Sequence, residues 1–151
     1  MIKHFQVRMF GVFLAILLTF AFSFGAMAQE KKSLYERVGG YNALAAVVDD
    51  FIGRLVGDSR FIKFFDGHST DSQKRIRQHI VDQFCEATGG PCIYTGRDMK
   101  TSHTGLKISE EDWEAAARHL TASLDKFKVP KTEKDEILAF VTSLKKDIVE
   151  K

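Results

Sequence analysis

Apolar residues that recur every three or four positions constrain the fold of this chain more than any other feature. Between Tyr41 and Val56 they occupy positions i, i+3, i+4, i+7, i+8 and i+11, which places them on one face of an α-helix. The same spacing recurs after Ser72, Ser109 and Pro130. No segment shows the strict alternation of apolar and polar residues that indicates a half-buried strand. We therefore expect an all-α domain.

Glycine, proline and capping residues set the limits of the expected helices. Ser33 and Glu36 form a capping-box pattern that opens a short first helix, and Gly39-Gly40 ends it. A second capping pattern, Ser109 with Asp112, opens a long helix. The other expected helical segments are residues 41–56, the aromatic turn 61–65, residues 72–88, residues 99–103 and a last helix after Pro130.

The first 28 residues differ in composition from the rest of the chain. Two basic residues precede an apolar run from Met9 to Gly25, and Ala26-Met27-Ala28 supplies the small residues of a signal-peptidase site. We interpret residues 1–28 as a secretory signal peptide and residues 29–151 as one globular domain, periplasmic or secreted. An uncleaved anchor is the alternative, because the run is just short of the ~20 residues that span a bilayer.

The charge of the mature chain argues against a nucleic-acid partner. Removing the signal segment takes away two of the 22 basic residues and none of the 20 acidic ones, so the remainder is formally neutral. No basic stripe with interleaved aromatic residues remains, and such a stripe is the footprint of a nucleic-acid binder. Small molecules or proteins are the expected partners, with no membrane contact after cleavage of the signal.

Cys85 and Cys92 are the only cysteines in the chain. In an oxidising compartment the pair could form a disulfide. The alternative is two buried thiols, since the sequence does not supply the Cα separation that decides the matter.

Two of the four histidines of the mature chain lie beside apolar residues. His103 follows Met99 by four positions, so both side chains project from one side of a short helix. His79 lies next to the apolar stripe of Ile76 and Ile80. His68 lies in a polar loop, where we expect it to be solvated. His119 is expected to play a structural role on the long helix. The spacing of these residues does not match a structural zinc site.

A haem requires an apolar slot, aromatic contacts with the porphyrin and an imidazole for the iron. The chain contains all three kinds of group. On the residues alone, a histidine near apolar residues is more often a hydrogen-bonded core histidine than an iron ligand. The sequence also lacks a nucleophile elbow, a glycine-rich phosphate loop and a His-Glu-x-x-His helix, so ordinary hydrolase mechanisms find no support.

The order of short motifs resembles that of group I truncated haemoglobins. The matching motifs are Gly39-Gly40, Phe64-Phe65, Gly89-Gly90-Pro91, Tyr94-Thr95-Gly96-Arg97 and Met99-Lys100-Thr101-Ser102-His103. The resemblance implies a two-over-two helical sandwich in which His103 is the proximal iron ligand. It also implies that Phe65 packs on the porphyrin and that Tyr94, near a propionate, and Met99 border the haem. We expect Phe84 and Ile108 to complete the haem contacts.

The distal side departs from the common pattern of that family. Ile52 stands where many members have a tyrosine, and Ile80 replaces a glutamine. With Ile76 and Phe51 they form an expected ligand pocket without a hydrogen-bond donor, which favours quick release of a bound gas. His79 aligns with a distal iron ligand of some cyanobacterial members. The alternative is a histidine at the pocket mouth that touches a propionate or water.

These residues predict a haem-iron protein that reversibly binds a diatomic gas, oxygen or nitric oxide. Leu144 stands where some members attach the haem covalently, and no Cys-x-x-Cys-His run is present, so non-covalent haem b is expected. The alternative is a six-coordinate bis-histidine protein that transfers electrons or senses redox state with a partner protein. Nitric-oxide dioxygenation is disfavoured by the apolar pocket and by the lack of a reductase domain.

Overall fold

The computed structural model describes residues 31–151, and this part of the chain contains helices and no strand. The expected signal peptide, residues 1–28, lies outside the described residues. The helices are α2 (Leu34–Arg37), α3 (Gly40–Gly57), α4 (Ile62–Phe65), α5 (Thr70–Ala87), α6 (Met99–His103), α7 (Glu110–Lys126), α8 (Lys131–Ser143) and α9 (Lys145–Ile148). The all-α prediction is confirmed.

Both predicted capping boxes are present. The Ser33 side chain accepts a hydrogen bond from the Glu36 backbone N–H, and the Glu36 carboxylate accepts one from the Ser33 N–H. Ser109 and Asp112 make the same reciprocal pair at the start of α7. Each box satisfies two backbone groups that the first helical turn leaves without an intrahelical partner.

Helix α5 begins two residues earlier than the apolar pattern predicted. The side chain of Ser69 accepts a hydrogen bond from the Ser72 N–H, which makes Ser69 the N-cap and Thr70 the first helical residue. The first turn is polar, so the apolar spacing carried no signal there. Capping and not burial therefore fixes this end of the helix.

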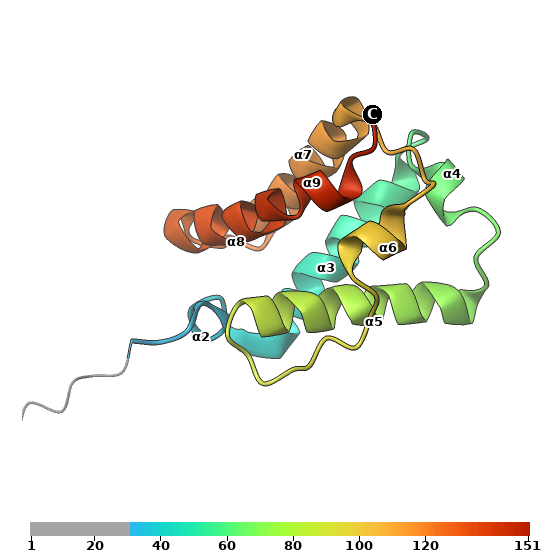
Figure 1. The fold of residues 1–151 in the computed structure, drawn as a ribbon. Helices are drawn as coiled ribbons and strands as arrows, with labels where there is room; N and C mark the ends of the chain where they lie inside the picture. Colours follow the sequence, from blue (N-terminus) through green and yellow to red (C-terminus); the bar gives the residue numbers. More distant parts are fainter. Residues whose placement is uncertain (1–30) are drawn as a thin grey trace, which may run out of the picture. The chain divides into compact units, whose positions relative to one another are not determined.

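Helix α3 forms the centre of the fold, because it packs against α5 on one side and α7 on another, while α7 also contacts α8 (Figure 1). The helices thus form two packed pairs, α3 with α5 and α7 with α8. The predicted apolar face of α3 is buried, with Leu44 1% and Val48 0% exposed. The main core unites buried residues of all four helices: Ala45, Val47, Val48, Val81, Phe84, Leu120, Leu124 and Ile137.

The last helix is interrupted at Leu144, where the apolar spacing predicted a continuous helix. The Leu144 N–H donates to the Val141 carbonyl, three residues earlier, instead of to the carbonyl four residues earlier. The Ser143 hydroxyl donates to the Phe140 carbonyl at the same turn. The break separates α9 from α8, and α9 then packs against α6.

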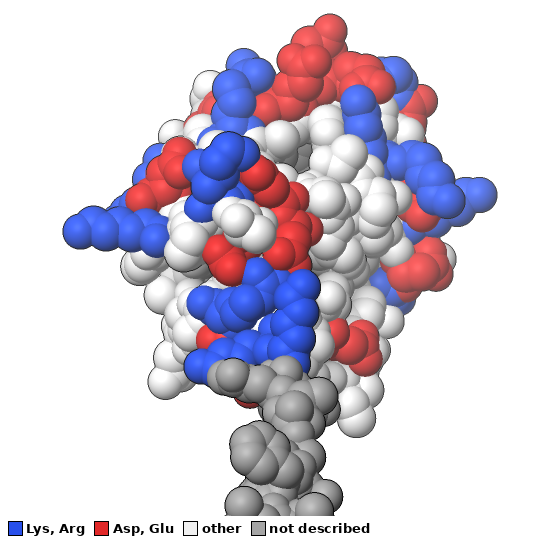
Figure 2. All heavy atoms as spheres, turned by 90° about the vertical axis from the view of Figure 1, so that its left-hand side faces the viewer, with Lys and Arg blue, Asp and Glu red and all other residues white. Residues whose placement is uncertain are grey.

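The face that carries α2 and the start of α8 bears charges of both signs side by side (Figure 2). Arg37 of α2 bridges two carboxylates of α8, at 2.5 Å from Glu133 and 2.6 Å from Glu136. Lys134 pairs with Asp125 of α7 at 2.6 Å. Within residues 31–151 no helix is both long enough and apolar enough to cross a membrane.

Candidate functional site

His103 is the last residue of α6, and its ring is held by the helix's own backbone. Nδ1 lies 2.8 Å from the carbonyl oxygen of Met99, one turn earlier, and the contact is partly buried. Asp98 caps the start of this short helix, since its carboxylate accepts from the Thr101 N–H at 2.8 Å and from the Thr101 hydroxyl at 2.7 Å. With Nδ1 engaged as a donor, Nε2 is the nitrogen left to accept or to bind a metal.

His79 on α5 differs from His103 in the hydrogen bonding of its ring. Its Nδ1 is buried and has no hydrogen-bond partner among the described residues. Its ring meets the ring of Tyr94 edge-on, with 6.0 Å between centroids and an interplanar angle of 79°. A buried ring nitrogen without a partner is costly, so it marks a position that a further group would satisfy.

Tyr94 lies in the loop that joins α5 to α6, and its side chain folds back onto that loop. Its hydroxyl donates to the Arg97 carbonyl at 2.5 Å. Gly96 allows this placement, because a Cβ there would lie 2.4 Å from the Tyr94 ring. Burial, followed by the negative charge of Asp98, raises the pKa of the Tyr94 hydroxyl. The hydroxyl therefore stays protonated and acts as a donor.

A disulfide between Cys85 and Cys92 ties the end of α5 to this same loop, with the two Cα atoms 5.7 Å apart. The structure thus decides between the two alternatives that the sequence left open. Cys85 is fully buried. A side chain at Gly90 would collide with the Tyr35 ring at 2.5 Å and with the Cys85 Sγ at 2.7 Å, which explains the glycine.

The expected distal residues lie together beside the core. Phe51, Ile52 and Ile80 are partly buried and pack against the main core cluster. Phe51 and Phe65 both border a second cluster. That cluster consists of the buried residues Leu55, Phe61 and Ala115. Phe51 packs against both clusters. It therefore connects Phe65 of α4 with the apolar wall that Phe51 and Ile52 of α3 and Ile80 of α5 form.

The remaining predicted site residues occupy the surrounding segments. Phe84 is 6% exposed, and its ring meets Phe140 of α8 edge-on at 5.9 Å. Ile76, Met99 and Ile108 are half-buried. Sequence reasoning missed Phe140, because it lies in the last helix, more than 50 positions after Phe84, and only the packing joins the two rings.

The other two histidines behave as the sequence predicted. His119 lies 2.9 Å from the carboxylate of Asp58 and packs edge-on against Phe61, so it links α7 to the turn after α3. The hydrogen bond with His119 lowers the pKa of Asp58. His68 is exposed. Within residues 31–151 no group of three or more His, Cys, Asp or Glu side chains could hold a metal ion.

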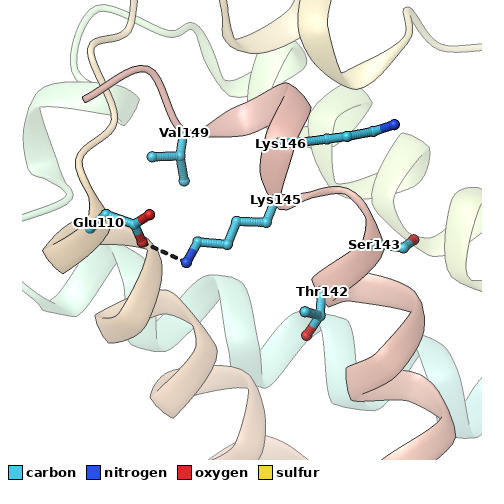
Figure 3. Close-up of a pocket in the computed structure, with 6 residues that line it drawn as sticks. All are labelled: Glu110, Thr142, Ser143, Lys145, Lys146 and Val149. Atoms are coloured by element: carbon cyan, nitrogen blue, oxygen red, sulfur yellow. Dashed lines mark ion pairs between the residues drawn. The ribbon is translucent and has the colours of Figure 1, made fainter.

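An open pocket of about 470 Å³ lies elsewhere, between the start of α7 and the junction of α8 with α9 (Figure 3). Lys145 reaches across it to Glu110 at 2.6 Å. None of the residues expected to touch a haem lines this pocket. Its charged, solvent-filled surface does not suit an apolar cofactor.

The residues around α5 and α6 suit a haem. A haem iron takes an imidazole nitrogen, and His103 presents one with its other nitrogen held by a carbonyl. The unpartnered Nδ1 of His79 and the apolar wall of Phe51, Ile52 and Ile80 are also compatible with a bound apolar group. Fold and site together define a haem protein of the globin class.

Comparison with known proteins gives the family. The sequence profile of the family described as "Bacterial-like globin" matches residues 33–150. A group 1 truncated hemoglobin of Mycolicibacterium paratuberculosis is 35% identical over 119 residues, which cover 79% of this chain and 85% of the relative. The chain therefore belongs to the bacterial-like globin family, among the group 1 truncated hemoglobins.

Solved structures agree on the fold. A truncated hemoglobin of Tetrahymena pyriformis in the Fe(III) form superposes with a TM-score of 0.71 and 28% identity, over 80% of this chain and 100% of that one. A 2/2 hemoglobin from a Synechococcus species, solved with covalently attached heme, gives a TM-score of 0.71 and 26% identity with the same coverage. The predicted two-over-two helical sandwich is confirmed, and haem iron is the cofactor of this family.

Proposed function

We propose that this protein reversibly binds a diatomic gas at a non-covalently held haem b, and that His103 is the proximal ligand. Globins as a family bind haem and diatomic gases. The haem supplies an iron whose second axial position can take a gas molecule. The observation that carries the proposal is the 2.8 Å contact between the Nδ1 of His103 and the Met99 carbonyl.

The Met99 carbonyl would act on His103 in two ways. It selects the tautomer with the proton on Nδ1, which directs the lone pair of Nε2 away from the helix. It also raises the basicity of the imidazole as an iron ligand. Because this hydrogen bond already fixes the orientation of the ring, His103 would lose little side-chain entropy when the haem binds.

The distal wall would favour release of the gas. Ile52, Ile76 and Ile80 have no polar side-chain atoms, so none of them can donate a hydrogen bond to a bound ligand. A single such bond contributes about 1 to 3 kcal/mol. We therefore propose fast exchange of the gas and no long-term storage.

We further propose that the protein acts in the periplasm or outside the cell. Residues 1–28 have the composition of a secretory signal, and disulfides such as Cys85–Cys92 persist in oxidising compartments.

The experiment reduces the haem-loaded protein with dithionite, removes the dithionite by anaerobic gel filtration, and titrates the ferrous protein with carbon monoxide and with oxygen. The titration is followed in the Soret region and reversed by purging. The expected result is a saturable spectral change with one ligand per haem that purging reverses. A Soret band that neither gas moves would contradict gas binding.

Redox function is the second candidate, and the buried Nδ1 of His79, which has no hydrogen-bond partner among the described residues, favours it. Coordination of iron by both His79 and His103 would keep the ligands similar in both oxidation states, which suits electron transfer to a partner protein.

Spectra of the ferric and reduced forms of the unmodified protein and of the His79→Ala variant separate the two candidates. Low-spin bands that become high-spin in the variant would assign His79 to the iron. His68→Ala is the matched control, because His68 is exposed and should leave the spectrum unchanged. Bands that are high-spin in all three proteins would exclude the bis-histidine form.

A further inference from the structure

The loop that follows His103 has little packing of its own. Leu106, the apolar residue in its middle, is 41% exposed. Gly105 and Lys107 both adopt positive φ angles, 87° and 55°. The Leu106 N–H donates to the His103 carbonyl at 3.1 Å, and Thr104, the first residue of the loop, donates to the Lys100 carbonyl at 2.9 Å from its N–H and at 2.6 Å from its hydroxyl. The loop therefore depends on other parts of the chain for its conformation.

Glu150, the penultimate residue, provides that support. Its two carboxylate oxygens accept from the Gly105 N–H at 2.7 Å and from the Lys107 N–H at 2.5 Å. Its own backbone N–H donates to the Ile108 carbonyl at 2.9 Å. Three hydrogen bonds, two of them to a charged group, thus join the end of the chain to the loop.

The position of Glu150 follows from the break in the last helix. Helix α9 packs against α6, and Figure 1 places the C-terminus beside the loop that leads from α6 to α7. A continuous last helix would carry residue 150 along a different path. The break at Leu144 thus brings Glu150 to this loop. There its carboxylate binds the N–H of Gly105, two residues after His103.

We propose that Glu150 is a positioning residue for His103: its carboxylate clamps the loop after α6 and so sets where the imidazole stands relative to the haem iron. This inference rests on the proposed role of His103 as the proximal ligand. In this role Glu150 acts through the backbone of Gly105 and Lys107, whose N–H groups its carboxylate holds. The Asp98 cap holds the start of α6, and Glu150 would hold its end.

The test compares Glu150→Ala and Glu150→Gln in the haem-loaded full chain. Glu114→Gln is the matched control, since Glu114 is exposed and pairs only with Arg118, at 3.9 Å. Two quantities are measured. Amide hydrogen exchange at Gly105 and Lys107 reports the clamp, and the iron–histidine stretching band, read by resonance Raman after photolysis of the carbon monoxide adduct, reports the proximal bond.

We expect Glu150→Ala to accelerate exchange of both amides at least tenfold and to shift or broaden the iron–histidine band. Glu150→Gln should lie closer to the unmodified protein, because an amide oxygen still accepts one hydrogen bond. Should Glu150→Ala fail to fold, the same two quantities in Glu150→Gln decide the question. Glu114→Gln should change neither quantity.

Faster exchange with an unchanged iron–histidine band would overturn the proposal and leave Glu150 as a tether for the chain end. Unchanged amide exchange in Glu150→Ala would show that the Glu150 carboxylate does not hold the loop. If the unmodified chain took up no haem, the proposed function would fail and this role of Glu150 with it. An intact haem spectrum with a band insensitive to Glu150 would refute only the present inference.

Discussion

His79 and His103 are both half-buried, yet the structure treats their rings in opposite ways. The Nδ1 of His103 has a backbone carbonyl 2.8 Å away, whereas the Nδ1 of His79 is buried with no partner among the described residues. The first ring is oriented before any cofactor arrives. The second meets the ring of Tyr94 edge-on but has no hydrogen bond at Nδ1 among the described residues. The difference suits a permanent ligand on one side of the iron and an exchangeable one on the other.

The helices that carry the two rings also differ, in length and in burial. His79 lies inside an 18-residue helix whose position is fixed by the core. His103 ends a 5-residue helix that buries no residue fully. An isolated helix of that length is not stable in water. Its order therefore comes from local hydrogen bonds, from the disulfide-tethered loop before it and from Glu150 after it.

The disulfide offers the largest expected effect, because it couples the two segments. Replacing Cys92 by Ser frees the loop before α6 while leaving the buried Cys85 in place. The link closes a short loop, with a sequence separation of 7, for which we expect a loss of about 2 to 3 kcal/mol of unfolding free energy. Urea denaturation of the oxidised protein and the variant measures the difference.

The unmodified protein in the reduced state is the control for that experiment, and it should match the variant to within about 1 kcal/mol. Equal stability of the oxidised and reduced forms would show that the disulfide does not hold the loop.

A polar group introduced on the distal side would add a hydrogen-bond donor to the apolar wall. Ile52→Tyr adds a hydroxyl to the apolar wall, and a hydrogen bond from it to a bound gas contributes about 1 to 3 kcal/mol. The rate at which oxygen dissociates from the variant should fall roughly 5- to 150-fold. Stopped-flow replacement of oxygen by carbon monoxide measures the rate. Ile52→Phe is the matched control, with a ring but no hydroxyl, and equal slowing in both variants would assign the effect to steric blocking.

The hydroxyl of Tyr94, the residue that meets the His79 ring, offers the smallest expected effect. Tyr94→Phe keeps the ring but removes the hydrogen bond to the Arg97 carbonyl, which costs about 1 kcal/mol of unfolding free energy. Tyr41→Phe is the control. The Tyr41 hydroxyl lies 3.0 and 3.4 Å from the side-chain atoms of Gln78, farther than the 2.5 Å of the Tyr94 hydrogen bond, so its loss should cost less. Equal losses in the two variants would show that the Tyr94 hydroxyl does not hold the loop.

The features that sequence reasoning predicted are local ones. Ser33 with Glu36 and Ser109 with Asp112 marked helix starts, because a cap and its partner lie three residues apart. Met99 and His103 are four positions apart, so their sharing of one helix face could also be predicted. The resemblance of the motifs to truncated haemoglobins supplied the two-over-two arrangement of the helices.

The features that sequence reasoning missed depend on distance in space. Whether Cys85 pairs with Cys92 depends on the path of the loop between them. The break at Leu144 interrupts a regular apolar spacing, so the pattern could not reveal it. The contacts of Glu150 join residues more than 40 positions apart, and a single acidic residue near a chain end carries no signal of its partner.

The most direct test of the account compares haem uptake by His103→Gly and His79→Gly, each titrated with haemin and followed in the Soret region with and without added imidazole. The account predicts that His103→Gly loses most of its haem affinity, that imidazole restores the band by occupying the vacated space, and that His79→Gly retains haem. An unchanged spectrum in His103→Gly, or loss of haem from His79→Gly alone, would contradict the assignment of His103 as the proximal ligand.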